Sequence, residues 1–437
     1  MPLCAANVTG GKGILRGEVM EHREAQAGFE MLKLPVWWTF GGLAVGLVLG
    51  ILLGGTAIEG AVLPITETVG NLWLRALQMT IIPLVAALLV TGISRMVETA
   101  SAGQMARRTL LTIFAVLACG TAFSAIATPL LLDAFPIPVS AGQALAVSPG
   151  GEAQAVPGIA EFIRSLVAPN LFAAAAENAM LPLVLFFALF GVAVAKLPDG
   201  QRAVMAGFFA ALGNAMLIII GWILWLAPAG VFALAIGVAA RAGAGAFLAL
   251  GHYIVIVASM GMAVLIAAYP LALLAGRKRL GEFARAILPA QAVAISTQSS
   301  LASLPAMLAA CRQLGVRETS ADFVLPLAVA IFRATSPAMN LAVAIYVAKL
   351  TGVPLTPTTI AAGAAVALVT TIGSVSLPGT ISFVASVGPI ALAMGVPIGP
   401  LALLVAVEML PDIVRTVGNV SMDVAVSASV DHARSKD

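Results

Sequence analysis

Residues 286–311 read AILPAQAVAISTQSSLASLPAMLAAC. Two apolar arms of about ten residues each flank the polar run STQSS at 296–300, and a helix of ten residues is about 15 Å long, half the hydrocarbon thickness of a bilayer. Neither arm can cross a membrane alone, so we expect the segment to enter and leave on the same side as a re-entrant hairpin. Non-helical backbone at that depth is stable only inside protein or along a wet cavity.

A second stretch, residues 358–394, has the same form. Its apolar arms flank GSVSLPG at 373–379, and the triplet Ser-Leu-Pro at 376–378 repeats the triplet at 303–305. Each broken segment is followed by one full apolar span, and the two pairs start from opposite sides of the membrane, so the repeat is inverted. Broken helices at matching positions of two repeats indicate the midplane binding site of a transporter.

The rest of the chain has the composition of an integral membrane protein. Of its 437 residues 60% are apolar and 10% are charged, whereas soluble domains carry roughly 25% charged residues. This excludes a soluble globule and a disordered chain, and 23 basic against 20 acidic residues give no basic surface for nucleic acid. Beside the two hairpins we expect eight transmembrane helices, at about 35–54, 70–94, 109–132, 171–195, 205–240, 247–275, 320–350 and 397–430.

The charges outside the spans predict an orientation. Residues 1–34 are polar and mixed in charge, which is typical of a cytoplasmic tail, and translation starts at Met1 or at Met31. Basic residues follow the second, fourth and sixth spans, whereas the connection 133–170 is mainly acidic. The positive-inside rule then places both termini, with the tail 431–437, on the cytoplasmic side of the inner (plasma) membrane.

The last span carries the strongest chemical signal. Glu408, Asp412, Arg415, Asn419 and Asp423 are spaced by 4, 3, 4 and 4 residues, which places them on one helix face within an arc of roughly 80°. An ionised side chain at the bilayer centre costs at least about 2.5 kcal/mol, so such groups are paired or line a ligand path.

Two readings of this face are open. In the first it is an internal salt-bridge ladder in which Arg415 holds Glu408 and Asp412. In the second the surplus of three carboxylates over one Arg binds a cation: a proton, a metal ion or a substrate ammonium. The other intramembrane charge, Arg333, precedes Pro337, which should open that helix and free backbone carbonyls; Arg333 either pairs with an acid of the last span or supports the site.

Other classes of function fit the sequence less well. A gated channel also uses broken helices but needs a continuous pore lining, whereas a compact acid–base cluster suits a solute that is bound and carried. An intramembrane enzyme is disfavoured, because the sequence has no Gly-x-Ser-x-Gly and no His-Glu-x-x-His motif.

Six motifs make residues 35–430 resemble the dicarboxylate/amino acid:cation symporter family, the bacterial relatives of the glutamate transporters. They are NLWLRALQMTIIPLV (71–85), LAPAGVFAL (226–234), SSLASLPAM (299–307), FVLPL (323–327), SLPGT (376–380) and PDIVRTVGNVSMD (411–423).

The resemblance implies an all-α polytopic elevator fold and a homotrimer in membrane lipid. Its static scaffold would comprise about 35–100 and 165–243, and its moving transport domain about 105–135 and 245–430. The implied function is secondary symport of a small-molecule substrate, an amino acid and most favourably an acidic one, with sodium and/or protons and no covalent cofactor. Asp412 favours an amino group; a C4-dicarboxylate:cation symporter is the alternative.

The resemblance also assigns residues by position. Asp412 would hold the substrate amino group and Arg415 its distal carboxylate, by bidentate geometry that suits a guanidinium. Further substrate contacts would come from Gln298, Ser299, Ser300, Ser336, Leu377, Thr416 and Asn419. One sodium site would use Asn419 and Asp423 with the carbonyl near Ala328, and a second would use carbonyls near Thr371, Ile372 and Ser374.

This chain departs from the family pattern in one place. The family's Asn-Met-Asp-Gly-Thr run falls on Phe332-Arg333-Ala334-Thr335-Ser336, and its Tyr and Thr of the third span fall on Leu117 and Gly120. Both changes remove ligands of one further buried sodium site, which we therefore expect to be absent. Arg333 would supply a fixed positive charge there. Fewer sodium ions would be coupled, or protons instead, with Glu408 or Asp423 as carrier.

Overall fold

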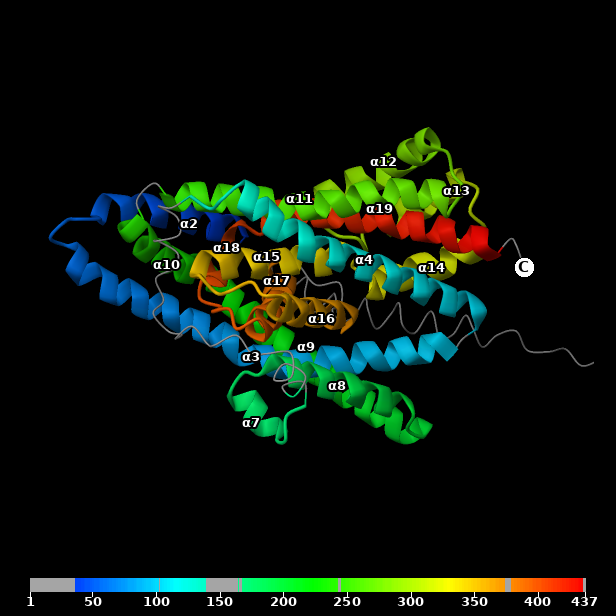
Figure 1. Ribbon diagram of the computed structural model, residues 1–437, viewed down its shortest axis with the longest axis horizontal. Helices are drawn as coiled ribbons and strands as arrows, with labels where there is room; N and C mark the ends of the chain where they lie inside the picture. Colours follow the sequence, from blue (N-terminus) through cyan, green and yellow to red (C-terminus); the bar gives the residue numbers. More distant parts are fainter. Residues whose placement is uncertain are drawn as a thin grey trace, which may run out of the picture.

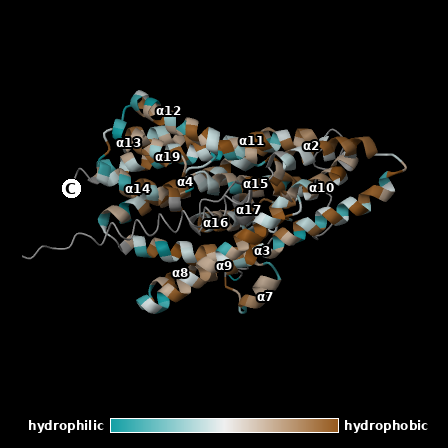
Figure 2. Ribbon diagram, turned by 180° about the vertical axis from the view of Figure 1, so that it is seen from behind, coloured by the Kyte–Doolittle hydropathy of each residue, from teal (hydrophilic) through white to brown (hydrophobic). Residues whose placement is uncertain are grey.

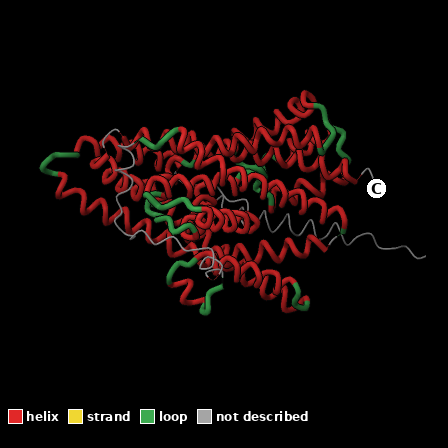
Figure 3. The backbone as a smooth tube through the Cα atoms, viewed as in Figure 1, coloured by secondary structure: helices red, strands yellow, loops and turns green. Residues whose placement is uncertain are grey.

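The computed structural model describes residues 36–101, 103–138, 164, 167–242, 245–373 and 379–434, and every regular element within them is a helix (Figures 1 and 3). The helices form an elongated bundle whose long axis most of them follow (Figure 1). Hydrophobic residues cover most of the bundle, and hydrophilic ones are most frequent at the end where α12, α13 and the C-terminus lie (Figure 2). Helices that are this apolar are expected of a membrane protein.

The first half of the chain contains seven described helices: α2 (Val36–Leu53), α3 (Glu59–Ser101), α4 (Gln104–Ala134), α7 (Leu171–Ala176), α8 (Met180–Ala195), α9 (Asp199–Trp225) and α10 (Ala227–Ala242). The second half contains α11 (Gly245–Leu274), α12 (Leu280–Thr297), α13 (Leu304–Gln313), α14 (Glu318–Ile331), α15 (Ser336–Thr351), α16 (Pro357–Gly373), α17 (Gly379–Ala393), α18 (Leu401–Val407) and α19 (Met409–Arg434).

Several predicted spans are divided in the structure. Four of the described helices (α3, α4, α9 and α11) are long and apolar enough to cross a membrane by themselves. The span expected at 171–195 is divided into α7 and α8, with Asn178 in the left-handed region at φ 55°, a conformation that Asn tolerates. The span expected at 205–240 is divided at Leu226, just before Pro228, which cannot donate a helical hydrogen bond.

The last two predicted spans are also interrupted, next to the charged residues. The span expected at 320–350 breaks into α14 and α15, with residues 332–335 between them, and Pro337 lies in the first turn of α15. The span expected at 397–430 breaks at Glu408 between α18 and α19. It also extends beyond its predicted end, since α19 continues to Arg434 and Arg317 holds Asp431 by an ion pair of 2.8 Å.

Small residues allow α2 and α10 to pack closely. Gly42, Gly46 and Gly50 on α2, and Gly54 directly after it, recur every four residues, and a Cβ on any of them would lie 2.5–2.8 Å from a carbonyl oxygen of α10. Small residues at this spacing are typical of membrane helix contacts, where backbones approach each other directly.

Each broken segment forms a pair of helices that pack against each other, α12 with α13 and α16 with α17. α13 has the ten residues that the sequence predicted for an arm, whereas α12 is longer: it begins at Leu280, and its first turns carry Glu282 and Arg285. The hydrophobic stretch alone therefore underestimated the helix, because polar first turns belong to it. The tip of the second pair, 374–378, lies outside the described residues.

Candidate functional site

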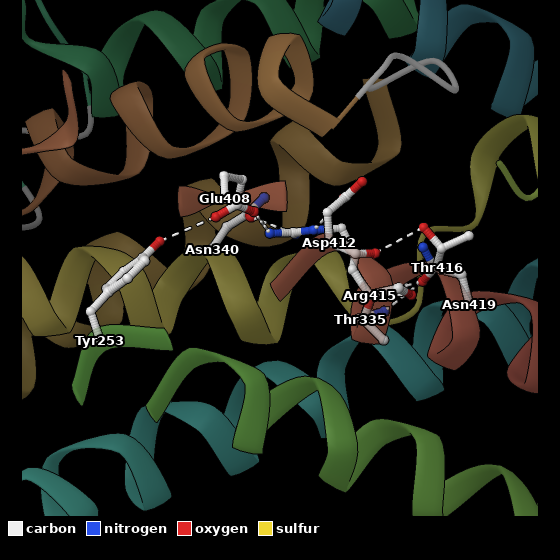
Figure 4. A network of polar contacts seen from close by, with 8 residues as sticks. All are labelled: Tyr253, Thr335, Asn340, Glu408, Asp412, Arg415, Thr416 and Asn419. Carbon is white, nitrogen blue, oxygen red and sulfur yellow. Dashed lines mark hydrogen bonds and ion pairs between the residues drawn. The ribbon is translucent and has the colours of Figure 1, made fainter. Parts of the chain in front are cut away.

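The polar face predicted for the last span lies at the junction of α18 and α19 and along α19. Glu408 follows the last turn of α18, and the amide of Asp412 donates to the Glu408 carbonyl oxygen at 2.9 Å, so the helical path continues through the junction. All five side chains of this face are buried, with exposed fractions between 1% and 3%. Figure 4 shows Glu408, Asp412, Arg415 and Asn419 of this face close together inside the protein.

Arg415 lies at the centre of a polar network (Figure 4). Its Nη2 donates to Glu408 Oε1 at 2.5 Å, and its Nη1 donates to Asn340 Oδ1 at 2.8 Å. Its Nε forms an ion pair with Asp412 Oδ1 at 3.2 Å. The Tyr253 hydroxyl donates to Glu408 Oε2 at 3.2 Å, so both oxygens of Glu408 are engaged. The ladder of Arg415 with Glu408 and Asp412, one of the two readings of the sequence, is therefore present.

This network is stable only while every charge in it keeps its partner. Removing one member of a buried ion pair costs roughly 3–5 kcal/mol, because the other charge is left unpaired in a medium of low dielectric. Arg415 has two carboxylates, an arrangement that tolerates the exchange of one anion for another. When a substrate carboxylate replaces one of them, the Arg415 guanidinium still has two carboxylate partners.

Hydrogen bonds hold the break between α14 and α15 against the same face of α19. The amide and hydroxyl of Thr335 both donate to Asn419 Oδ1 at 2.9 Å, and the hydroxyl also reaches the Arg415 carbonyl oxygen at 3.2 Å. Arg333, two residues earlier, interacts electrostatically with Asp412 as well as with Arg415. Asp412 thus interacts electrostatically with two guanidinium groups, those of Arg415 and Arg333.

Asp423 differs from the other acids of α19. It is 1% exposed, and neither of its carboxylate oxygens has a hydrogen-bond partner among the described residues. A buried carboxylate without partners is costly, and either a proton or a bound cation relieves that cost. Asn419 lies one turn earlier on α19, and the Ala328 carbonyl accepts from the Phe332 amide at 2.7 Å, with a second lone pair left for another partner.

Two further oxygens near this face are incompletely paired. Ser336 Oγ and Asp412 Oδ1 are buried without hydrogen-bond partners among the described residues, although Asp412 Oδ1 has the ion pair with Arg415. The Thr416 hydroxyl, by contrast, donates to the Asp412 carbonyl oxygen at 2.9 Å. Unsatisfied oxygens next to a guanidinium are suited to a ligand that carries both ammonium and carboxylate groups.

The tip of the first helix pair is a capping turn. Gln298 ends α12 in the left-handed conformation at φ 50°, which is uncommon for a residue other than glycine. The Ser299 hydroxyl accepts from the Ala302 amide, and the Ser303 hydroxyl donates to the Ser299 carbonyl. Gln298, Ser299 and Ser300 are all half-buried. Local capping accounts for part of this polar run and leaves Ser300 available to the site.

Only part of the second predicted sodium site, and not Leu377, lies within the described residues. Thr371 is buried on α16 and its hydroxyl donates to the Ala367 carbonyl at 2.7 Å. Ile372 lies on the same helix, but its side chain is outside the described part, as are Ser374 and Leu377. The second predicted sodium site therefore falls mostly outside the described residues.

Three positions of the departure from the family pattern, Leu117, Gly120 and Ala334, have no polar side chain. Leu117 of α4 is 1% exposed, and Ala334 is fully buried. A Cβ on Gly120 would lie 3.9 Å from the Ala334 carbonyl oxygen and from the Ala338 side chain, so α4 meets the break between α14 and α15 here. These side chains offer no oxygen to a hard cation.

Two residues of the network were not found from the sequence. Asn340 could have been noticed, because it is a polar residue of α15 in a run that is otherwise buried and almost wholly apolar. Tyr253 gave no signal, because it is one tyrosine in an apolar helix whose partner lies 155 residues away.

The comparisons with known proteins identify the family of the chain. Residues 36–433 match the sodium:dicarboxylate symporter family. The chain is 26% identical to the proton/sodium-glutamate symport protein of Bacillus subtilis, over 86% of this chain and 88% of the relative. It is 26% identical to C4-dicarboxylate transport protein 1 of Pseudomonas paraeruginosa (86% and 85%) and 27% identical to neutral amino acid transporter B(0) of Oryctolagus cuniculus (92% and 80%). The match covers nearly the whole described region, and the chain belongs to the sodium:dicarboxylate symporter family, a family of transporters.

Proposed function

We propose that this protein is a secondary symporter that carries an amino acid, most favourably an acidic one, across the inner membrane with sodium and/or protons. The observation that carries the proposal is the pairing of Asp412 and Arg415 one turn apart on α19, both buried and linked by an ion pair of 3.2 Å. One group suits a substrate ammonium and the other a substrate carboxylate.

Substrate binding would proceed by exchange of ion pairs. The distal carboxylate of the substrate would take the place of Glu408 on Arg415, while Asn340 keeps the guanidinium oriented from α15. The substrate ammonium would bind Asp412, whose Oδ1 has the ion pair with Arg415 and no further partner among the described residues. Polar groups at the α12 tip and at Ser336 would hold the substrate main-chain carboxylate, with the remaining assigned contacts around them: Gln298, Ser299, Ser300, Leu377, Thr416 and Asn419.

The coupling ions would bind next to this site. Asp423 provides an unpaired buried carboxylate, and with Asn419 and the Ala328 carbonyl it would form an oxygen-ligand site suited to sodium as cargo. The carbonyls near Thr371, Ile372 and Ser374 would form a second one. The apolar surroundings of Gly120 and Ala334 support the absence of a third sodium site.

Arg333 would replace the missing ion by a fixed positive charge. It interacts electrostatically with Asp412, so the site holds a permanent cation where the family pattern has ion ligands. We propose that the chain couples fewer sodium ions, or protons carried by Glu408 or Asp423. Glu408 would gain the proton when a substrate carboxylate displaces it from Arg415.

We further propose the family architecture: eight transmembrane helices with two re-entrant hairpins, both termini in the cytoplasm, assembled as a homotrimer. The scaffold would comprise about 35–100 and 165–243, and the transport domain about 105–135 and 245–430, moving as an elevator. Two observations support it: both broken segments form packed helix pairs, and α15 is buried on all sides at the centre of the bundle.

A C4-dicarboxylate is the second candidate substrate. Asp412 interacts electrostatically with two guanidinium groups, so an ammonium would have to compete with Arg333 for it. A substrate with two carboxylates and no ammonium would avoid that competition, and one of the relatives is named for C4-dicarboxylate transport.

Uptake of labelled L-aspartate into proteoliposomes tests the proposal. It would be measured with an inward sodium gradient and then with an inward proton gradient alone, with succinate and serine as competitors. Sodium-driven uptake that neither competitor blocks supports an acidic amino acid symporter and refutes proton coupling. Uptake driven by protons alone supports the changed coupling at Arg333. Accumulation of succinate without aspartate would show that Asp412 does not bind an ammonium.

A further inference from the structure

One surface of the molecule, far along the chain from the substrate site, combines unpaired cations with exposed leucines. The connection between α11 and α12 contains the run Arg277-Lys278-Arg279, and Arg285 follows in the second turn of α12. The three arginines are exposed. Within the described part of the chain, the side chains of Arg277 and Arg285 have neither an ion pair nor a hydrogen bond. These two cations are therefore available to a partner outside the chain.

Contacts of the connection with the rest of the protein hold it in place. The Lys278 amide donates to the Ala272 carbonyl oxygen at 3.0 Å, and the Lys278 Nζ donates to the carbonyl oxygen of Leu314, the residue that ends α13, at 2.6 Å. A Cβ on Gly276 would lie 2.8 Å from the Ala272 carbonyl oxygen and 3.0 Å from the Ala428 side chain, so the backbone packs closely against α19 here. Lys278 thus serves the fold, whereas the arginines on either side of it have no such role.

The positive charge of this surface is only partly compensated. Glu282 is the one acidic residue between positions 277 and 288. Its Oε1 lies 3.8 Å from Arg279 Nη1, and the two side chains are 60% and 88% exposed. An ion pair this long and this exposed contributes little. Three arginines against one glutamate leave an excess of positive charge that an anion would neutralise.

Exposed apolar side chains lie next to these arginines in the chain. Leu274, Leu280 and Leu288 are 71%, 54% and 59% exposed. Leu288 follows Arg285 by three residues, so both lie on one face of α12, and Ile295 continues this exposed face two turns later. α12 packs against α11, α13 and α19 and lies on the side of the bundle away from α8 and α9 (Figures 1 and 2). In a membrane protein, an apolar face in this position meets lipid.

A guanidinium at the end of an apolar, lipid-facing surface extends to the headgroup layer, because its charge is costly within the hydrocarbon. There it meets phosphate groups, which a guanidinium binds through two parallel hydrogen bonds.

We propose that the α11–α12 connection and the adjoining face of α12 bind an anionic phospholipid in the leaflet at this end of the molecule. Arg277, Arg279 and Arg285 would bind its phosphate, and the exposed leucines would contact its acyl chains. A zwitterionic phospholipid would bind more weakly, because its own ammonium group already compensates the phosphate. The site is separate from the acid–base cluster at Arg415, and its existence depends on neither the substrate nor the coupling ion.

Native mass spectrometry of the purified full chain in detergent tests the proposal. The chain would be titrated with phosphatidylglycerol and, separately, with phosphatidylcholine of the same acyl chains. Wild type should bind phosphatidylglycerol more tightly. Arg277→Gln and Arg285→Gln should each lower that affinity by about fivefold, the effect of one basic residue near an anionic lipid surface, and should leave the affinity for phosphatidylcholine nearly unchanged.

Arg202→Gln of α9 is the matched control. It removes the same charge, but the Arg202 side chain already has carboxylate partners in Asp199 and in Glu98, the latter at 3.3 Å. The affinity of this variant for phosphatidylglycerol should equal that of wild type.

A second measurement guards against a general change in the fold. Because the side chains of Arg277 and Arg285 are exposed and unpaired, the thermal unfolding midpoint of both variants without lipid should equal that of wild type. Phosphatidylglycerol should raise the midpoint of wild type and of Arg202→Gln, because it binds the folded state, and should raise that of Arg277→Gln and Arg285→Gln less.

Three results would overturn the lipid site. The first is equal affinity of wild type for the two lipids, or equal affinity of wild type and the Arg277 and Arg285 variants for phosphatidylglycerol. The second is displacement of the bound lipid by an equal concentration of inorganic phosphate, which would indicate a site for soluble anions. The third is a change in the mass of the protein assembly in these variants without a change in bound lipid, which would make this face a contact between copies of the chain. None of these measurements uses transport, so they decide the lipid site even if the proposed function fails.

Discussion

Arg415 and Asp423 lie two turns apart on the same face of α19 and are buried to a similar degree, 3% and 1% exposed, yet their surroundings are opposite. Arg415 is engaged through all three of its nitrogens, by two carboxylates and an amide. Asp423 has no hydrogen-bond partner at either oxygen among the described residues. Arg415 has a partner at each of its nitrogens, so it can bind a ligand only by exchanging one of them. Asp423 has no hydrogen-bond partner among the described residues, so a cation that binds there would be an additional partner. We assign the first to the substrate and the second to a coupling cation on this basis.

Replacement of Arg415 should have the largest effect. Arg415→Lys keeps the charge but loses the planar fork that binds two partners at once, and two or more hydrogen bonds to charged groups are worth about 1.5–3 kcal/mol each. Uptake of aspartate at low concentration should fall by at least about 100-fold. Arg317→Lys is the matched control, because the Arg317 side chain is 45% exposed in its ion pair with Asp431, and uptake by this variant should be nearly normal. Equal losses in the two variants would contradict the assignment.

Replacement of Asp423 should separate stability from coupling. In sodium-free buffer Asp423→Asn removes an unpaired buried charge, so the free energy of unfolding should rise by about 1–3 kcal/mol. Sodium should then stabilise wild type, because it binds the folded state alone, and should not stabilise the variant. Thermal unfolding with and without sodium measures both effects. Asp412→Asn should instead destabilise the protein, because Arg415 loses a charged partner. Stabilisation of both variants would contradict the distinction between a paired Asp412 and an unpaired Asp423.

Replacement of Arg333 should change selectivity rather than abolish transport. Arg333→Met removes one of the two cations that interact with Asp412, so a substrate ammonium no longer competes with Arg333 for this carboxylate. A dicarboxylate substrate would instead be repelled by Asp412, whose negative charge is less compensated in the variant. The ratio of aspartate to succinate uptake should rise by about 10-fold, the equivalent of one charge-assisted hydrogen bond. Competition assays with the two unlabelled substrates measure this ratio, and an unchanged ratio would show that Arg333 does not act on Asp412.

Removal of the Tyr253 hydroxyl should have the smallest effect. Tyr253→Phe deletes one hydrogen bond to Glu408, worth roughly 1 kcal/mol, and keeps the ring that packs against Tyr346. The substrate concentration for half-maximal uptake should change by about fivefold or less. A loss as large as that of Arg415→Lys would mean that Tyr253 contacts the substrate directly.

The sequence predicted the ladder on α19 because its residues share one helix, where spacing alone determines the face. It could not predict Tyr253 and Asn340, which reach Arg415 from α11 and α15 and depend on how those helices pack. Which acid Arg333 faces was open for the same reason. Its interaction with Asp412 became visible only when the break between α14 and α15 was placed against α19.

The sequence also predicted some of the helix boundaries and missed others. The apolar runs predicted α2 and α11 closely, because both are continuous and end at polar or glycine-rich residues. They did not predict the interruptions at Asn178, Leu226 and Glu408, which lie within runs that remain apolar or helical on either side. Hydropathy measures transfer to the bilayer and is insensitive to one residue of left-handed backbone or one missing amide donor.

The central claim is that Asp423 binds an ion that enters with a substrate held at Asp412 and Arg415. The most direct test is the simultaneous uptake of radiolabelled sodium and aspartate into proteoliposomes by wild type and Asp423→Asn, under an imposed membrane potential. The account predicts that wild type takes up sodium in fixed proportion to aspartate and that the variant takes up less sodium per aspartate. An equal ratio of sodium to aspartate in both proteins would contradict it.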